Sequence, residues 1–234
     1  MYIHPLKHDL FVSVSLNHTG IWDKDGLGLV FEQLKSDPDM GLLDIGAQLG
    51  TFTLTAALMG HKVVAVDPLV DNVVRLCRSV QMNGLVDYVT VVFGALSDAH
   101  KNMEIKRRRG NIGGTYVEET NSRRSKEKYP RHSIEAVLMD DLLSVVDFQS
   151  VFIKLDVETH EYFVLRGGKH LFDTLDVKGV LMEWDFFRTG QFGQEIIDFL
   201  TKQHFVPFSV AWKDHQLDPR YHSSWPFDVF WKKV

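Results

Sequence analysis

The chain has 234 residues, enough for one large domain with its own hydrophobic core. Its composition, 44% hydrophobic and 24% charged, is that of an ordinary globular protein, and no apolar run approaches the ~20 residues of a transmembrane helix. The net charge of −5 disfavours nucleic acid, so no DNA partner is expected.

Residues 1–39 are expected to form an N-terminal cap on the domain. Residues 9–22 suggest a small hairpin, and residues 28–37 read as a short helix. The first ten residues lack the apolar core of a signal peptide, so we expect a soluble chain. Loss of an N-terminal anchor before Met1 would instead place the protein in the secretory-pathway lumen, and the compartment stays unknown.

An alternation of strands and helices follows the cap. The expected strands are the apolar runs 41–45, 62–67, 88–95, 150–156 and 178–184. Helical periodicity covers 69–83 and 160–175. Continuous apolar strands that alternate with helices are typical of a parallel sheet covered on both faces.

The C-terminal part of the chain has a different pattern. The β-rich runs at 205–212 and 227–234 are joined by a loop alone, which adds one antiparallel strand to the sheet. We therefore predict a single α/β domain over 1–234, Rossmann-like and mostly parallel, with helices on both faces and one antiparallel C-terminal strand.

A basic segment, residues 98–133, interrupts the alternation after the third strand. Within it, residues 101–131 hold ten Lys and Arg against four Glu, a net charge of +6 that leaves −11 for the rest of the chain. A solvated insertion is the plain interpretation. Its position after the third strand places it on the rim where open α/β sheets bind ligands, so we predict a lid.

A glycine turn follows the first strand, in the stretch LLDIGAQLGTFTLTAA over residues 42–57. Gly46 and Gly50 remove side chains where backbone could approach a ligand, and the next helix offers free N–H groups. Glycines also serve tight turns that bind nothing. The second strand adds Asp67, a carboxylate placed to accept hydrogen bonds from ribose hydroxyls or to cap the next helix.

The spacing of the turn excludes two nucleotide motifs. A dinucleotide fingerprint requires glycine where Gln48 stands, and no Gly-Lys-Ser/Thr of a P-loop is present. The D-x-G-x-x-x-G pattern that begins at Asp44 resembles motif I of the class I S-adenosylmethionine-dependent methyltransferases. The resemblance implies S-adenosylmethionine as cofactor and S-adenosylhomocysteine as product.

The same resemblance assigns the cofactor contacts. Asp44 would lie near the ammonium end of the cofactor, the two glycines under its amino-acid part, Asp67 at the ribose, and Ala95 and Leu96 at the adenine. The other expected contacts come from the same turn and the neighbouring strand ends: Ala47, Gln48, Thr51, Phe52, Pro68, Asn72 and Asp156.

The fourth expected strand carries an unusual charge. Lys154 lies inside an apolar run, and burial of an ammonium requires a partner. Asp156, two residues on, shares its face of the strand, so the two are predicted to pair near the strand end. A structural ion pair without catalytic meaning would look the same.

Several motifs together resemble the FkbM-type methyltransferases over about residues 40–185. The stretch FIKLDVETHEYFVLRGG is similar to the family's K-I-D-V-E-G-x-E signature, and DIGAQLG, VDP, MNGL, GNIGG and VLMEW match further family motifs. Three positions depart from the pattern: Gln48 replaces Asn, Asp67 replaces Glu, and Thr159 replaces Gly.

The resemblance implies an O-methyltransferase that acts on a hydroxyl of a small molecule or glycan, with a sugar hydroxyl preferred. Asp156, supported by Lys154, is the expected base or base-positioning group, and His160 is its rival. A divalent metal on Asp156 with Asp140, Asp141 or Glu158 is conceivable but is not predicted.

Residues on the expected rim are assigned to the acceptor. Trp and Tyr suit sugar faces, and glycines allow close backbone approach. The expected acceptor contacts are Arg109, Asn111, Gly113, Gly114, Glu158, Glu183, Trp212 and Tyr221. Two alternatives stay open: an RNA methyltransferase that uses the basic segment, and an inactive protein that binds cofactor or glycan.

Overall fold

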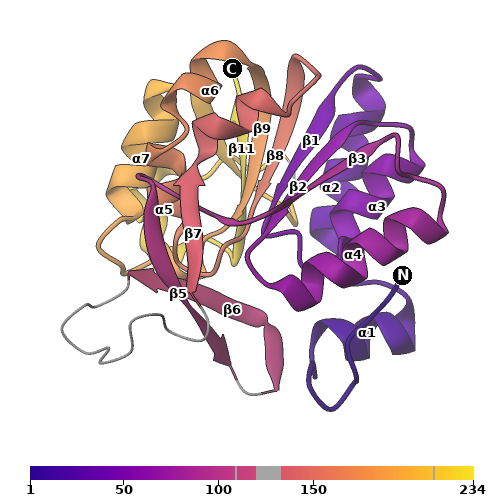
Figure 1. Cartoon of the computed structure of the whole chain (residues 1–234). Helices are drawn as coiled ribbons and strands as arrows, with labels where there is room; N and C mark the ends of the chain where they lie inside the picture. The colour runs from indigo at the N-terminus through magenta and orange to yellow at the C-terminus, as the bar shows by residue number, and fades with distance from the viewer. Residues whose placement is uncertain (109, 120–132, 213) are drawn as a thin grey trace.

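The computed structural model describes residues 1–108, 110–119, 133–212 and 214–234 (Figure 1). The strands are β1 (Gly41–Ile45), β2 (Val63–Asp67), β3 (Val89–Phe93), β4 (Ala95–Ser97), β5 (Lys101–Arg108), β6 (Asn111–Glu119), β7 (Ser133–Leu138), β8 (Ser150–Leu155), β9 (Asp176–Glu183), β10 (Phe205–Ser209) and β11 (Asp228–Lys233). The α-helices are α1 (Val12–Thr19), α2 (Lys24–Ser36), α3 (Thr51–Leu58), α4 (Val70–Met82), α5 (Glu161–Arg166), α6 (Lys169–Thr174) and α7 (Gly193–Lys202). Short 3-10 helices are η1 (Met139–Ser144), η2 (Asp185–Phe187) and η3 (Pro219–Ser224).

Seven of the described strands form the main sheet, in the order β10-β11-β9-β8-β1-β2-β3. Its central strands pair in parallel, whereas β11 runs antiparallel to both β9 and β10. Helices α2, α3 and α4 lie on one face of the sheet and α5, α6 and α7 on the other (Figure 1). The predicted α/β class, the parallel sheet and the antiparallel C-terminal strand are confirmed.

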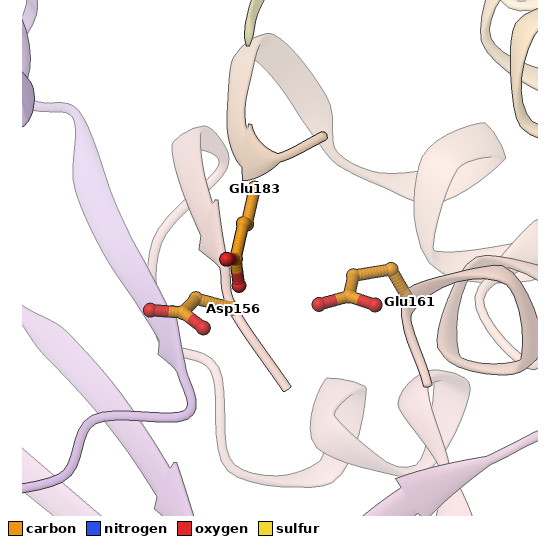
Figure 2. Close-up of side chains that lie close together, drawn as sticks. All are labelled: Asp156, Glu161 and Glu183. Atoms are coloured by element: carbon orange, nitrogen blue, oxygen red, sulfur yellow. The ribbon is translucent and has the colours of Figure 1, made fainter. Parts of the chain in front are cut away.

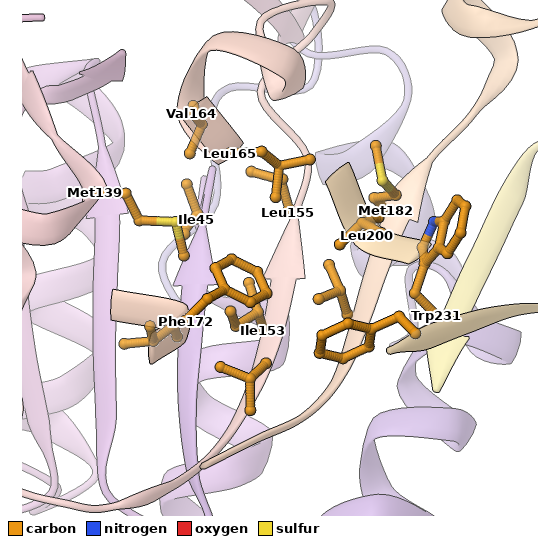
Figure 3. Close-up of a cluster of buried hydrophobic side chains, with 14 of the residues drawn as sticks. Ile45, Met139, Ile153, Leu155, Val164, Leu165, Phe172, Met182, Leu200 and Trp231 are labelled. Carbon is orange, nitrogen blue, oxygen red and sulfur yellow. The ribbon is translucent and has the colours of Figure 1, made fainter. Parts of the chain in front are cut away.

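Apolar packing on both faces holds the central strands in place. Every residue of β1 and of β2 is buried, as expected of strands covered on two sides. On one face, Ile45 and Ile153 from the sheet pack in a cluster with Val164, Phe172 and Leu200 from the helices (Figure 3). Full burial of one such side chain contributes about 1.5–3 kcal/mol. The carboxyl ends of the strands, where ligands bind in such sheets, are thereby fixed.

Two sequence-based expectations about local structure are wrong. Residues 9–22 contain helix α1, not a hairpin, and the helix expected over 160–175 is divided into α5 and α6. The division falls at Gly167 and Gly168. A Cβ on Gly167 would overlap the carbonyl oxygen of Ser97, so the chain passes too close to β4 there for a side chain.

The basic segment contributes strands that the sequence pattern did not reveal. A second, smaller sheet has the order β4-β7-β5-β6, and β5 and β6 form an antiparallel hairpin. Met103, Val117 and Ile134 give this sheet a small apolar core. In Figure 1 the hairpin and α1 both lie below the lower edge of the main sheet. Residues 120–132 of the segment are outside the described residues.

In the part of the chain that the structure describes, no helix combines the length and apolar character needed to cross a bilayer.

Candidate active site

A pocket of about 350 Å³ opens where the carboxyl ends of β1, β2, β8 and β9 meet. The basic hairpin β5–β6 forms one wall, and the N-terminal segment forms another through Phe11, Val12 and Trp22. The volume lies within the ~300–1,000 Å³ typical of small-molecule sites. The N-terminal wall was missed by sequence reasoning, because two separate aromatic residues in an amphipathic segment carry no recognisable motif.

The two glycines of the turn are required by the packing of the chain against itself. Gly46 has φ +82° and Gly50 has φ +83°, a backbone region that favours glycine. A Cβ on Gly46 would overlap the carbonyl oxygen of Asp156, and one on Gly50 would overlap the side chain of Leu76. Gly46 also lines the pocket, whereas Gly50 does not.

Asp44 lies beneath the turn, outside the lining of the pocket. Its side chain is fully buried and accepts hydrogen bonds from the backbone N–H of Thr53 at 3.0 Å and from the Thr53 hydroxyl at 2.5 Å. Burial raises the pKa of this carboxyl. In this structure Asp44 therefore ties α3 to β1. The sequence indicated a position near the ammonium end of the cofactor and did not predict this structural role.

Asp67 lines the pocket and organises the backbone around it. It accepts from the N–H of Gln48 at 2.9 Å and from the N–H of Leu69 at 2.8 Å, so it holds the turn that leads into α4 but is not the N-cap of that helix, which is Leu69. Asn72 donates to Asp67 at 3.1 Å and is itself held by the ring of His4, at 2.7 Å. Burial raises the pKa of Asp67 to about 6. The N-terminal segment thus supports the acid that sequence reasoning placed at the ribose.

An amide of Gln48 has no partner at the pocket wall. Gln48 has φ +51°, and its buried Nε2 lacks a hydrogen bond among the described residues. A Cβ on Gly113 would lie 2.9 Å from that nitrogen, so the glycine of β6 makes room for it. A buried donor without an acceptor fits the carboxylate of a bound amino acid, since burial of a polar group is costly unless it is hydrogen-bonded.

The predicted pair of Lys154 and Asp156 is present. The ammonium lies 3.2 Å from Asp156, donates to the carbonyl oxygen of Gly46 at 2.9 Å, and lies 3.9 Å from Asp44. Burial alone would lower the pKa of Lys154, but the negative charges of Asp156 and Asp44 outweigh that effect and hold the pKa above its usual value. The ammonium therefore stays charged and fixes the carboxylate of Asp156, whose side chain is 43% exposed toward the pocket.

More carboxyl groups than cations meet beside Asp156. One oxygen of Asp156, one of Glu161 and one of Glu183 lie within 4.8 Å of one another (Figure 2). Burial raises the pKa of Glu161 to about 8 and that of Glu183 to about 9. Glu158, nearby, lies 3.5 Å from the guanidinium of Arg108, and burial raises its pKa to about 7. This side of the pocket is acidic.

His160 lines the pocket but is poorly suited to accept a proton. Burial, with the charge of Lys101, lowers the pKa of His160 to about 4. Its Nε2 is 2.9 Å from the hydroxyl of Ser97, and its ring stacks on Phe163 at 4.7 Å. A base with such a low pKa has little driving force for proton transfer near neutrality. Between the two candidates the geometry favours Asp156.

Most of the remaining expected site residues line the pocket, and a few do not. Those that line it are Ala47, Thr51, Phe52, Pro68, Ala95, Leu96, Asn111, Gly113 and Gly114. Trp212 and Tyr221, 74% and 63% exposed, lie outside the lining. Arg109 lies outside the described residues. Asp140 and Asp141 are also absent from the lining, because they accept hydrogen bonds from Leu171 and Leu138 elsewhere.

The chain was compared with known proteins. The family model for the methyltransferase FkbM domain matches residues 44–207. The match covers well over half of the chain. The chain belongs to the FkbM methyltransferase family.

Solved structures agree with this assignment at the level of the fold. A methyltransferase from Geobacter sulfurreducens is similar with a TM-score of 0.51 and 13% identity, over 94% of this chain and 86% of that one. The kinase–methyltransferase WbdD is similar with a TM-score of 0.53 and 12% identity, over 98% of this chain and 44% of that one. A Staphylococcus aureus chain described as a candidate caffeoyl-CoA O-methyltransferase is similar with a TM-score of 0.50 and 9% identity, over 94% of this chain and 88% of that one. No curated protein sequence matches the chain.

As a member of the FkbM family, the protein is an S-adenosylmethionine-dependent methyltransferase. The pocket lining fits that cofactor, because it includes the acid Asp67, Gln48 with its unpartnered amide, and the apolar Ala95 and Leu96. Thr159 stands where the FkbM signature has glycine, and it has φ +85°. A β-branched residue rarely adopts that conformation, so threonine retains the backbone shape of glycine at a local energetic cost.

Proposed function

We propose that the protein is an O-methyltransferase that methylates a hydroxyl of a small molecule or glycan. A sugar hydroxyl is the acceptor that we favour. The observation that carries the proposal is the carboxylate of Asp156, fixed by Lys154 at 3.2 Å and open to the pocket. A hydroxyl acceptor must lose a proton as the methyl is transferred, and a positioned carboxylate can take it.

The cofactor side of the pocket is formed by β1, β2 and β4. When bound, S-adenosylmethionine supplies a methyl group already activated on a sulfonium. Asp67 would accept from the ribose hydroxyls, Gln48 would donate to the cofactor carboxylate, and Ala95 with Leu96 would border the adenine. The protein's remaining task is to align the acceptor oxygen, which contributes through proximity.

The acceptor side is acidic and aromatic. Arg108 lies over the rings of Tyr116 and Phe186, at 5.5 and 5.9 Å, and all three side chains line the pocket with Trp22 and Phe227. Carboxylates accept hydrogen bonds from hydroxyls, and aromatic faces suit the apolar faces of sugars. These features support a neutral polyhydroxyl acceptor.

Within the described residues 101–108 and 110–119, the basic segment gives little support to an RNA acceptor. Lys101 is paired with Asp98 and Glu119, and Arg107 lies 3.4 Å from Asp71. Basic side chains already paired with carboxylates are less available to neutralise phosphates. The acidic pocket would also repel the phosphates of an RNA. Experiment must therefore distinguish RNA methylation from methylation of a sugar hydroxyl.

The proposal is tested by acceptor identification. Labelled S-adenosylmethionine should be incubated with neutral glycans, acidic glycans, glycolipids and RNA, and the labelled product fragmented to locate the methyl. We expect label on an oxygen of a neutral sugar. Label in RNA would replace the proposal with its alternative, and cofactor binding without transfer to any acceptor would favour an inactive binding protein.

Replacing Asp67 with alanine should weaken cofactor binding by about 1–3 kcal/mol, because hydrogen bonds to a charged acceptor are lost. Calorimetry with S-adenosylhomocysteine measures this directly. Asp71→Ala is the matched control, because Asp71 lies in α4, the helix that follows Asp67, but outside the pocket lining. Equal affinities in the two variants would remove Asp67 from the cofactor site.

Replacing Arg108 with serine should raise the acceptor KM by about tenfold and leave the cofactor Kd nearly unchanged, because a charged hydrogen-bond donor is lost on the acceptor side alone. Arg107→Ser is the control, since its guanidinium faces Asp71 instead of the pocket. Steady-state kinetics with both substrates varied separates the two constants. If both variants match the native enzyme, the hairpin takes no part in acceptor capture.

A further inference from the structure

Three clustered carboxyl groups, two of which line the pocket, come from three different places in the fold. Asp156 follows the end of β8, Glu161 is the first residue of α5, and Glu183 is the last residue of β9. One oxygen of each lies within 4.8 Å of the other two, and Figure 2 shows the carboxyl groups of Glu161 and Glu183 directed toward Asp156. Like charges at this separation repel, so the arrangement needs a neutralising group.

Glu161 supplies a second observation. Its side chain is fully buried; Oε1 accepts from the N–H of Val157 at 3.0 Å and Oε2 is buried without a partner among the described residues, and Figure 2 shows the carboxyl group directed toward the cluster. Among the described residues, no cationic side chain lies within ion-pair distance of Glu161 or Glu183. Of the three clustered acids, Lys154 lies within ion-pair distance of Asp156 only, and Arg108 pairs with Glu158 outside the cluster.

We propose that Asp156, Glu161 and Glu183 bind a hard divalent cation, Ca²⁺, Mg²⁺ or Mn²⁺. The donor atoms are all oxygens, the ligands that these ions prefer. Opposed ligands on Ca²⁺ lie about 4.6–5.2 Å apart, twice its 2.3–2.6 Å bond length. Three oxygens within 4.8 Å of one another are therefore spaced on the scale of a Ca²⁺ site. Mg²⁺ has shorter bonds of about 2.0–2.1 Å and would draw the oxygens closer together.

A cation at this position would also serve the acceptor. Asp156 and Glu183 line the pocket, so the coordination positions that the protein leaves open face it. A hydroxyl of the acceptor is a suitable ligand for a hard cation. This last step rests on the proposed function, whereas metal binding itself does not.

The competing explanation is that the carboxyl groups share protons. A bound proton can replace the cation as the neutralising group, as the raised pKa values of Glu161 and Glu183 allow. Protonated carboxyls would give no saturable metal binding, so a direct titration distinguishes the two explanations.

The experiment uses the chelator-treated full chain without cofactor or acceptor. Mn²⁺ binding is followed by loss of the free-ion electron paramagnetic resonance signal, and Ca²⁺ and Mg²⁺ are then added as competitors. We expect one Mn²⁺ per chain, displaced by at least one competitor. Loss of outer-shell groups at metal sites costs about 10–100-fold in affinity, so Glu161→Gln, which removes the negative charge of a direct ligand, should weaken binding at least about tenfold.

Asp185→Asn is the matched control. Asp185 lies two residues from Glu183 and is paired with Arg188 at 2.6 Å, outside the pocket lining. The affinity of the Asp185→Asn variant for Mn²⁺ should stay within about threefold of that of the native protein. Absence of a saturable site in the native chain overturns the proposal, whether or not Glu161→Gln folds. Equal weakening in both variants also overturns it, because that result indicates a diffuse negative potential.

Discussion

Replacing Asp156 with asparagine should lower the rate of methyl transfer by on the order of 10²–10⁴-fold, the usual contribution of a general base. Asparagine has nearly the same shape and keeps an oxygen that can accept from Lys154, which lies 3.2 Å away in the native protein. The negative charge that receives the proton is lost. Cofactor affinity should change little, because the Asp67 wall of the pocket is untouched. Turnover at saturating acceptor and calorimetry with S-adenosylhomocysteine measure the two effects.

The same variant separates two roles of Asp156. If the carboxylate acts only as a metal ligand, saturating Mn²⁺ should restore the rate, whereas loss of the base persists at any metal concentration. Thermal unfolding must be recorded in parallel, because Lys154 would retain only Asp44, at 3.9 Å, as a charged partner. Near-native turnover without added metal would transfer the base role to another residue of the pocket, such as Glu183.

The features predictable from sequence were those with a short-range pattern. Parallel strands buried on both faces appear as uninterrupted apolar runs, which located the central strands to within a few residues. The pair of Lys154 and Asp156 followed from the two-residue period of a strand and from the cost of burying a lone ammonium. Each of these inferences used residues that are neighbours in sequence.

The features that the sequence did not predict depend on contacts between distant segments. His4 reaches Asn72 across 68 positions of the chain, and nothing in either local pattern indicates the other. In the hairpin, Met103 and Ile105 alternate with polar and charged residues, a strand pattern that the run of basic residues obscured. Glu161 is a carboxylate in the first turn of α5, where it suits the helix dipole, and its local sequence indicates nothing more. Only the fold brings it to Asp156 and Glu183.

Replacing Gly46 with alanine should destabilise the protein by more than about 4 kcal/mol and abolish cofactor binding, an effect at the upper end of those seen for single substitutions. The new Cβ would overlap the carbonyl oxygen of Asp156, a backbone atom that cannot rotate away. The turn after β1 would have to separate from the end of β8, and the positive φ adds its own cost. Urea unfolding with S-adenosylhomocysteine titration measures both losses.

Gly84→Ala isolates the part of this effect that is due to the backbone angle. Gly84 has φ +67°, and a Cβ there would meet nothing within 4 Å, so the substitution should cost only about 1–2 kcal/mol. The difference between the two variants measures the contact between the turn and Asp156. If both variants lose the same stability, the turn can move away from β8, and only the positive backbone angle requires glycine at position 46. If Gly46→Ala loses several kcal/mol more, the first glycine of the motif is set by the contact that aligns the cofactor turn with Asp156, so the spacing of cofactor and base is built into the main chain.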